Sequence, residues 1–134
     1  MTSARLPLQA AIVAALVAPG SGVPGLAVTA TPREGAPLPL VVVGLDTEAR
    51  DPFTSDKDET CVTLTHTVRV YAASSTQAKT LGAAALAAMT GPLAVEGFSV
   101  VSAALDFSAP GFEPGTPPAY ADTVRVRYTL APNP

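Results

Sequence analysis

The sequence has few of the residues that build metal, redox or nucleic-acid sites. It contains one cysteine (Cys61), one histidine (His66) and no tryptophan among its 134 residues. A lone cysteine excludes an intramolecular disulfide, and one cysteine with one histidine excludes a metal site built mainly from these two residue types. Aromatic residues make up 5% and the net charge is −3, which argues against a stacking platform or a basic patch for nucleic acid. We therefore expect no cofactor and no metal.

Charged side chains and long apolar runs are also scarce. Charged residues make up 14% of the chain, and no apolar run approaches the roughly 20 residues that span a bilayer, so we expect no membrane partner. Hydrophobic residues make up 48%, which is too high a fraction for a disordered chain. The length fits a single domain over residues 1–134, and a domain of this size buries only a modest fraction of its surface. That favours association with further copies or with a partner.

Two segments have the apolar periodicity of helices. In the first, Leu6–Val17, apolar residues recur at helical spacing and form one stripe. The second is expected over Ser75–Met89, where Ser74 and Gln77 stand at capping-box spacing and Gly91-Pro92 closes the C-terminal end. The sequence therefore predicts two helices.

Five further segments have the composition or alternation of strands. They are Leu26–Thr31, Leu38–Leu45, Thr60–Tyr71, Phe98–Phe107 and Tyr120–Leu130. Asp46–Glu59 and Ala109–Ala119 are predicted loops. The order α-β-β-β-α-β-β predicts an α+β fold, with a mainly antiparallel sheet of about four to five strands and both helices packed on one face. In the fourth strand, the residues that alternation places on one face are Val101, Ala103, Leu105 and Phe107.

Two motifs match part of the sequence pattern of a ligand-binding site but lack the flanking elements or the further ligands that such a site needs. Gly20, Gly22 and Gly25 match GxGxxG, but a dinucleotide site needs this pattern between a strand and a helix, and here it follows a helix. We interpret it as a turn. Asp56, Asp58 and Thr60 are spaced like the first ligands of a calcium loop, yet the glycine and the distal glutamate of such a loop are missing.

The candidates for catalysis and for peptide binding are isolated residues. His66 falls on the apolar face of a strand, where a core histidine is the default, and general-base work would need a nucleophile and an orienting carboxylate beside it. Cys61 is most simply a small packing residue. The PxxP pattern at Pro114–Pro117 is short, which is typical of a stiff loop rather than a partner ligand. With no paired carboxylates, Walker loop or nucleophile elbow, we expect a protein that is not an enzyme.

One segment concentrates the negative charge. The acidic residues of Asp46–Glu59 are Asp46, Glu48, Asp51, Asp56, Asp58 and Glu59. With Arg50 and Lys57 as its only bases, the segment carries a net charge of −4, and the rest of the chain carries +1. Two interpretations stay open: a solvated loop, or a loop that docks on a basic partner or lines a passage and repels DNA phosphates.

The layout of the whole chain resembles the tail-terminator, or tail-completion, proteins of long-tailed bacteriophages and gene transfer agents. The segments that carry the resemblance are the opening helix QAAIVAALVA (Gln9–Ala18), PREGAPLPLVVVGLDT (Pro32–Thr47), LTHTVRVYAAS (Leu64–Ser74), STQAKTLGAAALAAM (Ser75–Met89) and the closing VRVRYTL (Val124–Leu130). The turn Glu34–Pro37 is the most distinctive of them. The proline-rich segment Ala109–Ala119 is longer than the family pattern leads us to expect.

The resemblance implies a structural role. Such proteins form a hexameric ring on the head-proximal end of the tail tube, stop the tube from growing and present a surface to the neck of the capsid. The implied partners are further copies of the chain, the tail tube protein and a head–tail connector or neck protein, with DNA passing through the ring without specific binding. The implied location is the virion tail, after assembly in the host cytoplasm. The acidic loop would then face the tube or the channel, and Phe112, Glu113 and Pro114 would belong to a second loop against a neighbouring subunit or the neck.

Two alternatives remain at this point. One is another neck or head-closure component of the same particle. The other is an exported small binding module with a cleaved N-terminal segment, because Arg5 followed by the apolar run Leu6–Val17 imitates the charged and hydrophobic regions of a signal peptide. An amphipathic helix is the competing interpretation of that segment.

Overall fold

The computed structural model describes residues 4–18, 20–22, 28–29, 38–50, 61–114 and 118–133, with the backbone alone at 28–29 and 45–50. Its elements are α1 (Arg5–Val17), β1 (Val28–Thr29), β2 (Leu40–Arg50), β3 (Val62–Ala72), α2 (Ser75–Thr90), β4 (Phe98–Glu113) and β5 (Ala119–Pro132). This order of helices and strands is the predicted one.

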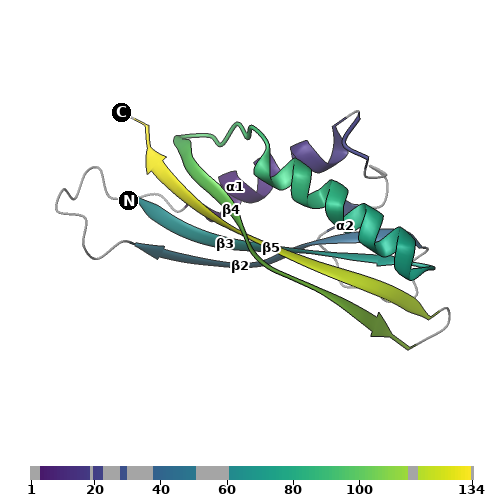
Figure 1. Cartoon of the computed structure of the whole chain (residues 1–134). Coiled ribbons are helices and arrows are strands. Elements are labelled where there is room, and N and C mark those ends of the chain that lie inside the picture. The colour runs from purple at the N-terminus through teal and green to yellow at the C-terminus, as the bar shows by residue number, and fades with distance from the viewer. Residues whose placement is uncertain are drawn as a thin grey trace.

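The strands form one twisted sheet in the order β1-β2-β3-β5-β4, and both helices lie on the same side of it (Figure 1). The four long strands pair antiparallel throughout. β1 has two residues and pairs parallel to β2. The prediction of an α+β fold, with a mainly antiparallel sheet and two helices on one face, is confirmed.

Helix α2 begins and ends where the local sequence provides partners for its free backbone groups. The Ser74 hydroxyl accepts a hydrogen bond of 3.2 Å from the backbone N–H of Gln77, one of the first-turn donors that have no partner within the helix. At the other end, the Gly91 N–H donates to the carbonyl of Ala87 at 3.0 Å. The predicted helix and its N-cap are confirmed. Its buried residues recur at helical spacing and are Ala78, Leu81, Gly82, Ala85 and Met89.

The two central strands, β3 and β5, supply most of the core on the helix-covered face. Alternation along β3 and β5 buries Val62, Leu64, His66, Val68, Val70, Val124, Val126, Tyr128 and Leu130. Leu8, Ile12 and Leu16 of α1 join the same cluster. Each large aliphatic side chain buried there contributes about 1.5–3 kcal/mol. His66 is fully buried in this core, as its position on the apolar face predicts.

A tyrosine of β5 connects the sheet to the end of α2. Tyr128 is fully buried, and its hydroxyl donates a hydrogen bond of 2.7 Å to the backbone carbonyl of Met89. That carbonyl lies in the last turn of α2, where the helix offers no N–H to pair with it. Burial raises the pKa of the Tyr128 phenol above its ordinary value of 10.0, because the phenolate is poorly solvated there. Tyr128 therefore caps the helix from a different element.

A glycine allows α2 to lie close to β5. A Cβ atom at Gly82 would stand 2.8 Å from Cγ and 3.1 Å from Cβ of Asp122, and it would collide with the carboxylate oxygen. Asp122 is the strand partner of the buried Val70, so it lies on the helix-covered face. Burial raises the pKa of the Asp122 carboxyl, and the nearby Lys79 opposes this rise. The helix-to-sheet distance at this point depends on the absence of a side chain.

Both predicted loops are wrong at their borders. β2 continues through Asp46 and Glu48 to Arg50, pairing with β3, so the start of the acidic segment is strand. β4 continues to Glu113, so Ala109–Glu113 pairs with β5. In both cases a neighbouring strand supplies hydrogen-bond partners that the local composition does not reveal. The remainders of these loops at 51–59 and 115–117, and most of the predicted strand around β1, lie outside the described residues.

The predicted alternation of the fourth strand is also wrong. Register shifts between Val100 and Ser102 and between Leu105 and Phe107 each add one residue to β4 and change the phase of the alternation. The four residues expected on one face are therefore divided between the faces. Phe107 pairs with Arg125 and lies on the helix-free face, whereas Leu105 pairs with the buried Val126 and lies on the helix-covered face. The four residues that were expected on one face are Val101, Ala103, Leu105 and Phe107.

We expect Tyr128→Phe to lower the free energy of unfolding by about 1–2 kcal/mol at neutral pH, because the Met89 carbonyl then stays buried without a donor. The native phenol holds its proton more tightly than the unfolded one, so its contribution is complete below pH 10.0 and declines as the pH rises further. The difference between wild type and variant therefore shrinks above that pH. Urea denaturation across pH measures both effects, with Tyr120→Phe as the exposed control. Equal midpoints for wild type and Tyr128→Phe at neutral pH would contradict the capping role.

We expect Gly82→Ala to destabilise the protein by about 1 kcal/mol, because overpacking against Asp122 outweighs the better helix propensity of alanine. In an Asp122→Ala background the same substitution costs less, since the carboxylate that the new methyl group meets is gone. A double-mutant cycle measured by thermal unfolding gives the coupling. Additive effects would show that the carboxylate does not limit the approach of α2.

Candidate assembly surfaces

Two surfaces on the β4 side of the sheet are the candidate functional features of the chain. Across the described ranges, no group of three or more histidine, cysteine, aspartate or glutamate side chains is placed to hold a metal ion. The helices in the described part of the chain are too short or too polar to cross a membrane. The two surfaces are an apolar strand edge and a strip of arginines.

β4 is an edge strand that carries exposed apolar side chains. It stands last in the sheet and runs along its margin, with β5 as its neighbour on one side (Figure 1). The backbone N–H and C=O groups on the other side have no strand partner among the described residues, so they can pair with another chain. Four large apolar residues are exposed along this strand, divided between its two faces, and exposed apolar surface is typical of sites that contact other proteins. They are Val101 (62% exposed), Leu105 (49%), Phe107 (45%) and Phe112 (56%).

Three arginines form the second surface, the arginine strip, on the helix-free face. Arg69 comes from β3, and Arg125 and Arg127 come from β5, each between residues that point into the core. The strip leans toward β4, because Nη2 of Arg69 lies 3.7 Å from where a Cβ atom of Gly111 would be. Ala121 of β5 is the strand partner of Gly111, and these two small residues leave room for Arg69 to reach across.

Asp106, next to the second register shift of β4, ties the arginine strip to the edge strand. Its Oδ2 accepts a hydrogen bond of 2.7 Å from Nε of Arg125, and its Oδ1 lies 3.1 Å from Nη2 of Arg127. The guanidinium of Arg125 also lies over the ring of Phe107, 5.1 Å from its centroid. The two arginine side chains remain 43% and 61% exposed. Ion pairs at such sites contribute about 0–1 kcal/mol, so their main effect is to orient charges that a partner can still reach.

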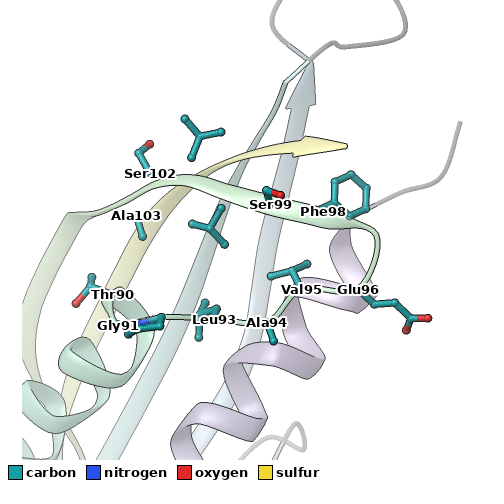
Figure 2. Close-up of a pocket in the computed structure, with 13 residues that line it drawn as sticks. Thr90, Gly91, Leu93, Ala94, Val95, Glu96, Phe98, Ser99, Ser102 and Ala103 are labelled. Atoms are coloured by element: carbon teal, nitrogen blue, oxygen red, sulfur yellow. The ribbon is translucent and has the colours of Figure 1, made fainter. Parts of the chain in front are cut away.

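A shallow hollow lies between the segment that follows α2 and the start of β4. Its volume is about 880 Å³, and residues 90–96 and 98–103 line it. Figure 2 shows mainly small and apolar side chains around it, with Glu96 extending away from its centre. Catalysis needs a nucleophile, a base or an oxyanion donor that converge on one point. The polar side chains of the lining are Thr90, Glu96, Ser99 and Ser102, and the hydroxyl of Ser99 donates to Asn133 rather than to one of the others.

The structure places two of the six predicted acidic site residues. Asp46 and Glu48 lie in β2, as strand partners of His66 and Leu64. The other four lie outside the described residues and are Asp51, Asp56, Asp58 and Glu59. That this segment faces a tube or a channel stays a prediction.

Two of the three residues of the second predicted site are on a strand rather than in a loop. Phe112 and Glu113 end β4, and Pro114 follows them. The Phe112 ring packs edge-on against Tyr120 of β5, with centroids 5.2 Å apart. The three predicted residues therefore lie at one end of the β4–β5 pair. Their contact with another subunit or with a neck stays a prediction.

Sequence reasoning missed the arginine strip. The alternation of Val124–Leu130 places Arg125 and Arg127 on the outward face, so part of the signal was present. Arg69 lies far from them in the sequence. That it joins them follows from the pairing of β3 with β5, which alternation within one strand does not reveal.

Comparison with known proteins gives a match to the fold. None of the protein-family models matches the sequence, and no curated protein matches it either. The chain is similar to a chain in a solved structure of the virion of a native gene transfer agent particle, with a TM-score of 0.70. The two chains share a fold. The similarity covers 98% of this chain and 99% of the other, with 22% of residues identical.

Proposed function

We propose that the chain is a structural protein of a virion and, more specifically, a tail terminator. It would form a hexameric ring on the head-proximal end of a tail tube, stop the tube from growing and join the tail to the neck of the capsid. The observation that carries this proposal is the similarity of its fold, over 98% of the chain, to a chain of a gene transfer agent virion. The resemblance of its sequence to tail-terminator proteins adds the specific role.

The physical character of the chain supports a role in assembly. We propose that residues 1–134 form a single small domain, which by its size buries a limited core. Among the described residues, β4 leaves an apolar edge available to other subunits. We propose that its partners are further copies of itself, the tail tube protein and a head–tail connector or neck protein. DNA would pass through the ring without specific binding, and the acidic segment Asp46–Glu59 would face the tube or the channel. Phe112, Glu113 and Pro114 would contact a neighbouring subunit or the neck.

Deletion of the gene in the producing cell tests the proposal. Without a terminator, tube subunits continue to add, so electron microscopy is expected to show over-long or ragged tails that are not attached to heads. Complementation with the wild-type gene should restore particles with tails of normal length. Full heads beside free tails of normal length would indicate another neck or head-closure component instead. Intact particles after deletion would contradict a virion role and favour the exported binding module.

Charge reversal in the acidic segment tests its proposed position. We expect the triple variant Asp56→Lys, Asp58→Lys, Glu59→Lys to reduce infectivity or gene transfer at least about tenfold, because positive charge in the channel binds DNA phosphates and positive charge at the tube opposes docking. Reversal of the exposed Glu96, which lies outside this segment, serves as the control. If the triple variant transfers genes as well as wild type, the segment faces neither the tube nor the channel.

A further inference from the structure

We infer that the helix-free face of the sheet, centred on the arginine strip, contacts the phosphates of DNA without reading its sequence. The inference rests on the proposed function, in which DNA passes through the assembled protein, and it names the surface of the chain that DNA meets. Three observations carry it: the spacing of the arginines, the contacts that hold their guanidinium groups, and the polar character of the surface around them.

The three arginines form a row that crosses from β5 to β3. Arg125 and Arg127 are two residues apart on β5, so they share a face and their Cα atoms are about 6.5–7 Å apart. Arg69 of β3 is the strand partner of Thr123, which lies two residues beyond Arg125 on the same face. The row therefore continues at the same step onto the neighbouring strand. Successive phosphates of a nucleic-acid strand are separated by a comparable distance, so each arginine can meet one phosphate.

The guanidinium groups of the row are held by neighbouring side chains. Arg69 lies over the ring of Tyr71, 5.5 Å from its centroid, and Asp106 contacts both Arg125 and Arg127. Contacts of this kind reduce the side-chain entropy that is lost when an anion binds. A guanidinium group presents parallel N–H donors that match a phosphate. The row is therefore oriented before a ligand arrives.

The surface around the row is polar, which favours DNA over a protein as its partner. The strand partners of Arg127 and Arg125 on β3 are Thr65 and Thr67, and Thr123 continues the same face of β5. Threonine hydroxyls, like arginines, commonly bind phosphate oxygens. The buried centre of a protein–protein interface is depleted of charged residues, whereas a protein–DNA interface is more polar and much more positively charged. A row of arginines among threonines has the second composition.

The arginines outnumber the acidic side chains described on this face. Those acidic side chains are Asp106 and Glu113, and Glu113 lies at the far end of β4 with one carboxylate oxygen buried. The net charge of the whole chain, −3, does not reveal this local excess. Because the excess is small, the contact with DNA should be weak and sensitive to salt. Such a contact suits DNA that moves past the surface and is not retained.

The first test is the fluorescence anisotropy of a labelled DNA duplex titrated with the full-length chain. We expect the logarithm of the binding constant to fall against the logarithm of the salt concentration with a slope of about −2 to −3, since each phosphate neutralised contributes about −0.9. Arg127→Gln, at a side chain that is 61% exposed, should weaken binding about threefold and bring the slope about 1 closer to zero. Lys79→Gln removes the same charge from α2, on the other side of the sheet, and should leave the slope unchanged.

The second test uses a substitution with the opposite effect. Asp106→Asn removes the carboxylate that competes with phosphates for Arg125 and Arg127, so we expect it to tighten DNA binding about threefold at low salt. A gain in affinity cannot result from loss of the fold. Circular dichroism and thermal unfolding show whether each variant remains folded.

Three results would overturn the inference. One is a wild-type chain that does not bind the duplex up to ~1 mM at about 50 mM salt. Another is an equal loss of affinity in Arg127→Gln and Lys79→Gln, which would assign the binding to overall charge. The third is tighter binding of labelled poly-glutamate than of DNA, which would make an acidic protein the partner. None of the three decides the terminator role, which the tails after gene deletion test separately.

Discussion

The packing of α2 on the two central strands is the contact on which the rest of the structure depends. The helix is fixed at two points: Tyr128 donates to the Met89 carbonyl at its C-terminal end, and Gly82 lies against Asp122 in its middle. Hydrogen bonding and steric fit therefore define its position over β3 and β5. α1 completes the same core on the side of β2. Because α1 lies over β2 and α2 lies mainly over β3 and β5, the helices cover little of β4.

This arrangement explains why exposed apolar surface gathers on one strand. The core is closed over β3 and β5, where the large side chains are fully buried, and it is open at β4, where Val101, Leu105 and Phe107 reach solvent. In this domain the two helices leave apolar side chains of β4 exposed. The remaining apolar area is available for burial between chains. On the helix-free face, the arginine strip lies beside the exposed ring of Phe107, so positive charge and apolar surface adjoin there.

The sequence predicts the elements well and their extent poorly. The repeating apolar positions of α2 and the alternation of β3 and β5 were sufficient to predict two helices on one face of an antiparallel sheet, because burial on one side imposes these periods. β4 continues through Pro110 and Gly111 because these residues pair with β5, although proline and glycine disfavour strand structure. The phase of β4 depends on its two register shifts, which no local signal predicted. The arginine strip required the neighbour relation of β3 and β5, so it appeared only in the structure.

The two register shifts of β4 have a consequence for solubility. β4 places 16 residues against the 14 of β5, so the strand bends and its twist increases at each extra residue. Amyloid-like stacking needs flat strands that repeat in register over many chains, and an edge interrupted in this way fits that geometry badly. An apolar edge can thus remain exposed in the free protein without templating fibres. The same irregularity restricts the edge to partners whose own backbone follows its curve.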